Sequence, residues 1–202
     1  MKNLIKIVSF IFIILFSLES NASEASNWLK IEVDKILIAY QDPSLPKENR
    51  FLLIEQTINN NFASKSIAIH CAKESYKNAN EQERTKYIEL FKRHLALNIS
   101  SLMQGYSNQE YKLVDSRYDE KNKVNYIDME IILDTGDILV TWRVLKHKGR
   151  YFVIDLIISG ISLVETKRSE FNSMLKTVNY SLTELNKKLS NQNDISYNTV
   201  IN

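Results

Sequence analysis

The segment spanning residues 124–158 constrains the fold more than any other part of this 202-residue chain. Polar and apolar residues alternate through three short runs, which is the pattern of strands that bury one face. The face expected to be buried carries Asn125, Ile127, Met129, Ile131 and Leu133 in the first run, Ile138, Val140, Trp142 and Val144 in the second, and Phe152, Ile154, Leu156 and Ile158 in the third. Asp134-Thr135-Gly136-Asp137 and Lys148-Gly149 separate the runs and have the composition of turns. The sequence therefore predicts an antiparallel meander with one apolar face.

A further strand and several helices are expected around this meander. Residues 111–117 read as a first strand, which makes four in all. Amphipathic periodicity predicts helices at residues 26–40, 46–62, 64–76, 81–104, 164–176 and 182–190, with a frayed polar end from Asn191. Asn80 to Glu83 and Ser181 to Glu184 have the form of capping boxes. This order predicts an α+β fold, a four-stranded antiparallel sheet with one face covered by the N- and C-terminal helices. Periodicity alone does not distinguish a filled core from an apolar pocket between the sheet and the helices.

The first 22 residues have the composition of a secretory signal peptide. Lys2 and Lys6 precede an apolar run over residues 7–18, and Ala22 marks the expected cleavage point. Cleavage after Ala25 and an uncleaved N-terminal anchor are the alternatives, although the apolar run is short for a membrane span. Residues 23–202 are then expected to form one exported domain.

Charge and cysteine usage narrow the functional class. The formal net charge of +2 argues against a dedicated nucleic-acid-binding protein. Cys71 is the only cysteine, so the exported domain must be stabilised by its apolar core and not by an internal disulfide. We interpret Cys71 as a small buried residue, because adjacent positions on a helix point about 100° apart and His70 cannot pair with it side by side.

No catalytic, metal-binding or cofactor-binding motif emerges from the sequence. His70, His94 and His147 lack the spacing of zinc ligands, and His94 is expected at the boundary of an apolar helix face. Asp128 and Glu130 lie two residues apart on one strand face, as paired catalytic carboxylates can, but we favour the solvated face of the sheet. The chain has only four glycines and no glycine-rich phosphate loop.

Several motifs, in order along the chain, resemble those of one family. They are Glu83-Arg84-x-x-Tyr87-x-x-x-Phe91-x-x-x-Leu95, Trp142-Arg143, Tyr151, Asp155, Gly160-Ile161-Ser162 and Arg168-x-x-Phe171. On these residues the chain resembles the MlaC family, the periplasmic phospholipid-binding components of the Mla lipid-transport pathway. The resemblance extends over nearly the whole of residues 23–202. Asn179 departs from it, since many members have glycine before the final helix.

The resemblance implies a soluble periplasmic carrier that shuttles phospholipid between membranes. Its implied partners are an inner-membrane ABC transporter with its substrate-binding ring and an outer-membrane lipoprotein complex. It implies no enzymatic activity and no cofactor, and we expect a monomer. A hopanoid is the alternative ligand. Two alternatives belong to other functional classes. One is a periplasmic hydrolase or isomerase on a cone-like α+β fold, using Asp128, Glu130 or Asp155. The other is a structural envelope adaptor with a filled core.

The lipid chains are expected between the sheet and the helices. Two acyl chains of about 16 carbons represent roughly 25 kcal/mol of transfer free energy, at about 0.8 kcal/mol per methylene, so a carrier must cover them. The expected lipid-binding residues are Phe91, Leu95, Ile99 and Tyr106 from the helices and Ile127, Met129, Ile131, Val140, Trp142, Val144, Ile154 and Leu156 from the sheet. The headgroup should stay in solvent. Arg143, Lys167 and Arg168 are candidates near it, although solvated surface is the favoured role for each.

Overall fold

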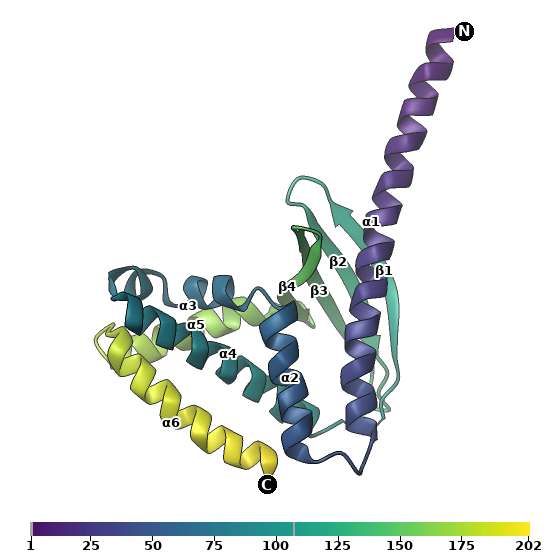
Figure 1. The fold of residues 1–202 in the computed structure, drawn as a ribbon. Coiled ribbons are helices and arrows are strands. Elements are labelled where there is room, and N and C mark those ends of the chain that lie inside the picture. Colours follow the sequence, from purple (N-terminus) through teal and green to yellow (C-terminus); the bar gives the residue numbers. More distant parts are fainter. Residues whose placement is uncertain (1, 107) are drawn as a thin grey trace.

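The computed structural model describes residues 2–106 and 108–202, with side chains from residue 22 onward. Helices come first, then the sheet, then helices again, which confirms the predicted α+β class (Figure 1). The elements are α1 (Lys2–Gln41), α2 (Lys47–Asn61), α3 (Ser64–Asn78), α4 (Glu81–Met103), β1 (Tyr111–Asp119), β2 (Val124–Ile131), β3 (Ile138–His147), β4 (Arg150–Ile158), β5 (Ile161–Ser162), α5 (Leu163–Thr177) and α6 (Leu182–Ile201).

The strands form one antiparallel sheet in the order β1-β2-β3-β4-β5, so the predicted meander is confirmed. The sheet has one strand more than the four predicted, because the short β5 pairs back onto the end of β4. Ser159 and Gly160 make this reversal possible, since both have positive φ, 48° and 84°. Two consecutive left-handed residues are typical of the tight turns that join hairpin strands.

A bulge in the pairing of β3 with β4 changes which residues of β4 face the helices. Arg143 pairs with Asp155 but the next residue, Val144, pairs with Val153, so Ile154 has no partner. The alternation therefore shifts by one position. Val153 is 2% exposed within the core that faces the helices, and Ile154 is only half-buried. The prediction that placed Ile154 on the buried face is wrong, because it assumed an uninterrupted two-residue alternation and a bulge inserts one extra residue.

The helix boundaries follow their capping residues. At the start of α4, the Asn80 side chain accepts from the Glu83 backbone N–H, and the Asn80 N–H donates to the Glu83 carboxylate, each at 2.9 Å. This is the capping box predicted from the sequence. The expected fraying from Asn191 is wrong, because α6 continues to Ile201. The buried Asn193 amide donates to the Leu90 carbonyl at 2.9 Å, which fixes this half of α6 on α4.

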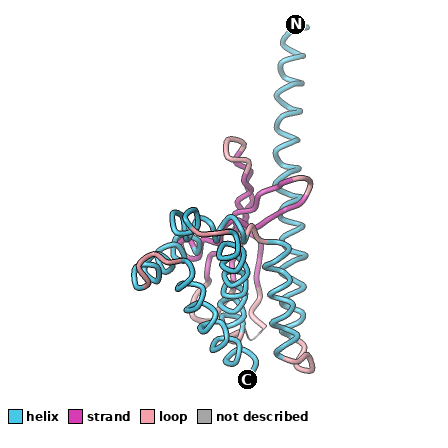
Figure 2. The backbone as a smooth tube through the Cα atoms, turned by 60° about the vertical axis from the view of Figure 1, so that its left-hand side comes forward, coloured by secondary structure: helices cyan, strands magenta, loops and turns pink. Residues whose placement is uncertain are grey.

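The helices form two groups around the sheet. α1 packs along β1 and β2, whereas α2 and α5 reach β4 and α6 packs mainly on α4. Both views show α1 as one long helix, standing apart from the group formed by α3, α4, α5 and α6 (Figures 1 and 2). One apolar core lies within the helical group and a second lies between α1 and the sheet. The Ala63 N–H donates to the Val153 carbonyl at 2.9 Å and joins the α2–α3 connection to β4.

The N-terminal half of α1 extends beyond the sheet, away from the rest of the protein (Figure 1). The side chains of residues 1–21 lie outside the described residues, so the signal peptide over residues 1–22 stays a prediction. Within the part of the chain that the structure describes, no helix combines the length and apolar content needed to cross a membrane.

Candidate functional site

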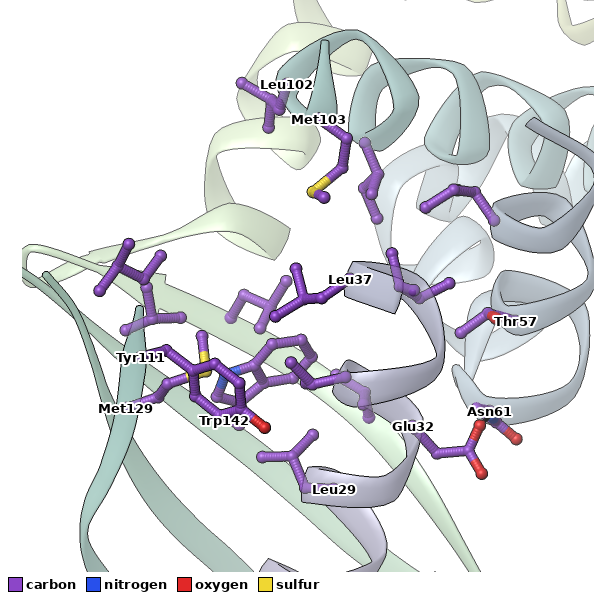
Figure 3. Close-up of a pocket in the computed structure, with 18 of the residues that line it drawn as sticks. Leu29, Glu32, Leu37, Thr57, Asn61, Leu102, Met103, Tyr111, Met129 and Trp142 are labelled. Carbon is purple, nitrogen blue, oxygen red and sulfur yellow. Dashed lines mark hydrogen bonds between the residues drawn. The ribbon is translucent and has the colours of Figure 1, made fainter. Parts of the chain in front are cut away.

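An apolar cavity lies where α1, α2 and the C-terminal end of α4 meet the sheet. Its volume is about 260 Å³, and its wall is built mainly from aliphatic and aromatic side chains (Figure 3). The lining residues are Trp28, Leu29, Glu32, Val33, Ile36, Leu37, Ile54, Thr57, Ile58, Asn61, Phe62, Ile99, Leu102, Met103, Tyr106, Gln109, Tyr111, Met129, Ile131, Val140, Trp142, Val153, Leu156, Ile158 and Leu163. A concave apolar site with a few polar groups at its edge is the usual form of a small-molecule binding site.

α1 supplies a whole wall of the cavity. Its apolar residues recur every three or four positions and so form one stripe along the helix; they are Trp28, Leu29, Val33, Ile36 and Leu37. Figure 3 shows Leu29 and Leu37 of this stripe close to Trp142 of β3. These α1 residues were missing from the expected lipid-binding set, although their periodicity is visible in the sequence.

The opposite wall comes from α2 and from the end of α4. Ile54 and Ile58 of α2 are buried, and both line the cavity. Met103 of α4 points into the cavity toward Leu37 of α1 (Figure 3). Leu102 also lines the cavity but is 70% exposed, so the cavity opens to solvent at this end of α4.

Polar side chains bridge the edges of the cavity. The Asn61 amide of α2 donates to Glu32 Oε2 of α1 at 2.8 Å, next to Thr57 (Figure 3). At the other end, the Gln41 amide donates to the Tyr106 hydroxyl at 3.0 Å. These contacts hold α1 to its neighbours without placing a charge in the centre of the cavity.

One further hydrogen bond fixes α1 on the sheet. The Tyr111 hydroxyl of β1 donates to Asp34 Oδ1 of α1 at 2.5 Å. Burial of the phenol, together with this bond to the carboxylate, raises the pKa of Tyr111 above its usual range. The phenol therefore stays protonated and remains a donor across the neutral pH range.

The structure brings together part of the set expected from the sequence. Ile99, Tyr106, Met129, Ile131, Val140, Trp142 and Leu156 all line the cavity.

Five expected residues do not line it. Phe91 and Leu95 are buried in the core of the helical group, because α4 turns that part of its stripe toward α5. Ile127 and Val144 are completely buried in the core between α1 and the sheet. Ile154 is the bulged residue of β4.

The basic residues considered for the headgroup also lie elsewhere. Arg143 Nη1 is 3.3 Å from Asp155 Oδ2. The ammonium group of Lys167 is buried, not solvated as expected, and donates to Asn98 at 2.6 Å and to Glu170 at 2.7 Å. Arg168 pairs with Glu165 at 3.0 Å on the surface. None of the three lines the cavity.

The groups considered for catalysis do not converge on the cavity. Asp128 accepts hydrogen bonds from Thr141 at 2.6 Å and from Arg117 at 3.1 Å, and it is absent from the cavity wall. Cys71 is 3% exposed, as its interpretation as a small buried residue requires, and burial raises the pKa of its thiol to about 12. Among the described residues, no group of three or more His, Cys, Asp or Glu side chains could hold a metal ion.

Comparison with known proteins places this architecture in a family. The structure is similar to that of a phospholipid-binding protein from Ralstonia solanacearum, which was solved in complex with a phospholipid. The TM-score is 0.73 at 19% sequence identity, and the match covers 87% of this chain and 98% of the Ralstonia chain. The model of the MlaC protein family matches residues 32–191. The chain therefore belongs to the MlaC family.

Proposed function

We propose that this protein is a periplasmic phospholipid carrier, with the acyl chains held in the cavity between α1, α2, α4 and the sheet. The observation that carries the proposal is the apolar wall itself, built on the α1 stripe of Trp28, Val33 and Leu37 and on Trp142 of the sheet. The fold is shared with a protein that was solved with a phospholipid bound. The MlaC family is periplasmic in general, which agrees with the predicted signal peptide.

The physical case rests on covering acyl chains from water. Each methylene transferred out of water contributes about 0.8 kcal/mol, so even a partly enclosed pair of chains is bound strongly. The cavity of about 260 Å³ is near the lower end of the roughly 300–1,000 Å³ typical of ligand pockets. Two long chains would therefore widen it, which requires α1, packed mainly on β1 and β2, to shift relative to α2, to which the Asn61–Glu32 hydrogen bond joins it. The opening at Leu102 gives the remainder of the lipid a route to solvent.

A binding and transport role fits the rest of the protein better than catalysis does. Asp155, a candidate for the hydrolase or isomerase alternative, is only 4% exposed and is used in structural hydrogen bonds. Asp128 is paired with Thr141 and Arg117, apart from the cavity. The proposed carrier would move lipid between two membrane complexes. One is an inner-membrane ABC transporter with its substrate-binding ring, and the other is an outer-membrane lipoprotein complex.

Two adjacent residues of α1 provide a matched test. Leu37 lines the cavity, and Ile38 is 65% exposed and does not. Leu37→Asp places a carboxylate where acyl chains would lie, and Ile38→Asp introduces the same charge on the outer surface. Binding of a fluorescent phospholipid should fall at least about tenfold in Leu37→Asp and stay at the wild-type level in Ile38→Asp.

The circular dichroism spectra and unfolding midpoints of both variants show whether they are folded. Equal lipid binding by the two folded variants would contradict the proposed site. Repeating the titration with a hopanoid tests the alternative ligand, because a hopanoid that binds while phospholipid does not would replace the proposed cargo.

A further inference from the structure

A second pocket adjoins the apolar cavity and differs from it in chemistry. Its volume is about 440 Å³, and it shares Met103 and Tyr106 with the cavity. Beyond these two residues the wall becomes polar and basic, with Lys47 and Arg50 from the first turn of α2 and Gln104 from the end of α4. Among the described residues that line this second pocket, none is acidic. An apolar compartment and a basic one thus share part of their wall.

Arg50 has hydrogen-bonding capacity that the protein does not use. Its guanidinium lies 5.6 Å from the centre of the Tyr40 ring, and its Nη2 donates to the Asp42 carbonyl at 2.6 Å. Its Nε is buried and has no hydrogen-bond partner among the described residues. The nearby Asp42 carboxylate accepts from the Ser44 hydroxyl and N–H, at 2.6 and 2.9 Å, within its own turn. Hydrogen bonds from Ser44, with a smaller contribution from the Arg50 charge, lower the pKa of the Asp42 carboxyl. Asp42 therefore acts on Arg50 at a distance, and its carboxylate oxygen that accepts from Ser44 does not occupy the guanidinium donors.

The start of α2 adds to this positive potential, because the acidic residue of its first turn, Glu48, is absent from the pocket wall and accepts from the Tyr197 hydroxyl. Lys47 Nζ donates to the Asn202 backbone oxygen at 2.6 Å and can make further hydrogen bonds, since an ammonium group has three donors. The helix begins after Pro46 with no side-chain cap, so no side chain accepts from its first N–H groups. Free N–H groups at a helix N-terminus attract anions, and an arginine and a lysine beside them strengthen this preference.

We propose that this second pocket binds the phosphate group of the lipid whose acyl chains occupy the cavity, with Arg50 and Lys47 as its main contacts. This inference rests on the proposed function, since it joins the two compartments through the shared residues Met103 and Tyr106. The glycerol would pass beside Tyr106, where the apolar wall ends. The headgroup beyond the phosphate stays in solvent, which leaves the site tolerant of different headgroups.

The experiment compares two lipids that differ only in the phosphate. Lipid-free protein is titrated with phosphatidic acid and with diacylglycerol carrying the same chains, and separately with inorganic phosphate. The wild-type protein should bind phosphatidic acid at least about tenfold more tightly than diacylglycerol. In the double variant Lys47→Gln, Arg50→Gln this preference should disappear while diacylglycerol affinity is unchanged. Lys47→Gln alone keeps the Arg50 contacts with Tyr40 and Asp42 and should lose part of the preference.

A matched control removes two positive charges elsewhere. Lys121 and Lys176 are exposed and line neither pocket, so Lys121→Gln, Lys176→Gln should keep the wild-type preference. Equal wild-type affinity for the two lipids, or a preference that survives in the double variant, would overturn the phosphate site and leave the carrier function standing. If the protein binds inorganic phosphate but binds phosphatidic acid no more tightly than diacylglycerol, the second pocket is a site for free anions, and the proposal is also overturned. Failure to bind either lipid would instead refute the proposed function.

Discussion

The hydroxyl of Ser162 donates a hydrogen bond of 2.7 Å to the carboxylate of Asp155, and because Ser162 is the N-cap of α5, this bond ties the start of that helix to β4. The other carboxylate oxygen accepts from the N–H groups of Leu156 and Val164, at 2.8 and 3.1 Å. Arg143 Nη1 lies 3.3 Å from Oδ2 and supplies the balancing charge. One buried side chain therefore fixes β4, β5 and the first turn of α5 relative to each other, next to the cavity wall at Leu156.

Asp155→Asn should destabilise the protein by about 2–4 kcal/mol, because it breaks a buried charged hydrogen-bond network and leaves Arg143 without its partner. Urea unfolding at neutral pH measures this loss. Asp194→Asn, at an exposed position on α6, should change the free energy of unfolding by less than about 0.5 kcal/mol. Equal effects of the two substitutions would show that Asp155 does not hold the layers together.

The thiol of Cys71 should be inert in the folded protein. Burial, with a further contribution from Glu165, raises the pKa of the thiol to about 12, so at about pH 8 roughly one molecule in ten thousand carries a thiolate. A disulfide reagent that reports by absorbance should label the native protein only slowly and label it fully in denaturant. Rapid labelling under native conditions would mean that α3 opens easily around this residue.

Glu170 should make stability depend on pH in the acid range. Its interaction with the His94 imidazole, 3.6 Å away, and with Lys167 lowers the pKa of the Glu170 carboxyl from 4.5 to about 2 despite its partial burial. A depressed pKa in the folded state stabilises the protein above the unfolded pKa of about 4.3, and this stabilisation is lost as the pH falls toward about 2.

The free energy of unfolding, measured between about pH 5 and pH 2.5, should therefore fall more steeply for the wild type than for Glu170→Gln. Glu89 is an exposed carboxylate 4.0 Å from Lys86, and Glu89→Gln should follow the wild-type curve. Identical slopes for the wild type and Glu170→Gln would refute the proposed contribution of this network.

The two tryptophans of the protein offer an internal probe of the cavity. Trp28 of α1 and Trp142 of β3 both line it. A phospholipid with brominated acyl chains should therefore quench the intrinsic fluorescence, and the same lipid without bromine should not. Trp28→Phe isolates Trp142 and should remain quenchable. Binding without quenching in either protein would place the acyl chains outside the cavity.

Local signals in the sequence predicted the elements of this fold well. The capping box at Asn80 and Glu83 gives the start of α4, and the turn at Lys148-Gly149 joins β3 to β4 with φ of 48° and 76°. Asn179, before the final helix, adopts φ of 50°, a conformation that asparagine tolerates. Each of these features depends on a few neighbouring residues and can therefore be recognised along the chain.

Features set by distant contacts could not be predicted in the same way. The bulge at Ile154 arises from pairing with β3, and the order of α6 beyond Asn191 comes from packing on α4. The stripe of α1 was recognised, but nothing local shows that Leu37 faces Met103 across a cavity. Val140 and Trp142, which were expected among the lipid-binding residues, do line the cavity, because the alternation of β3 is regular where it pairs with β2.

Native mass spectrometry of the protein purified from bacterial periplasm tests the central claim most directly. The carrier account predicts a population heavier than the polypeptide by the mass of a diacyl phospholipid, and this added mass should disappear after organic extraction. Leu37→Asp should carry less of it than Ile38→Asp. A folded protein that purifies without lipid and acquires none from phospholipid vesicles would contradict the account.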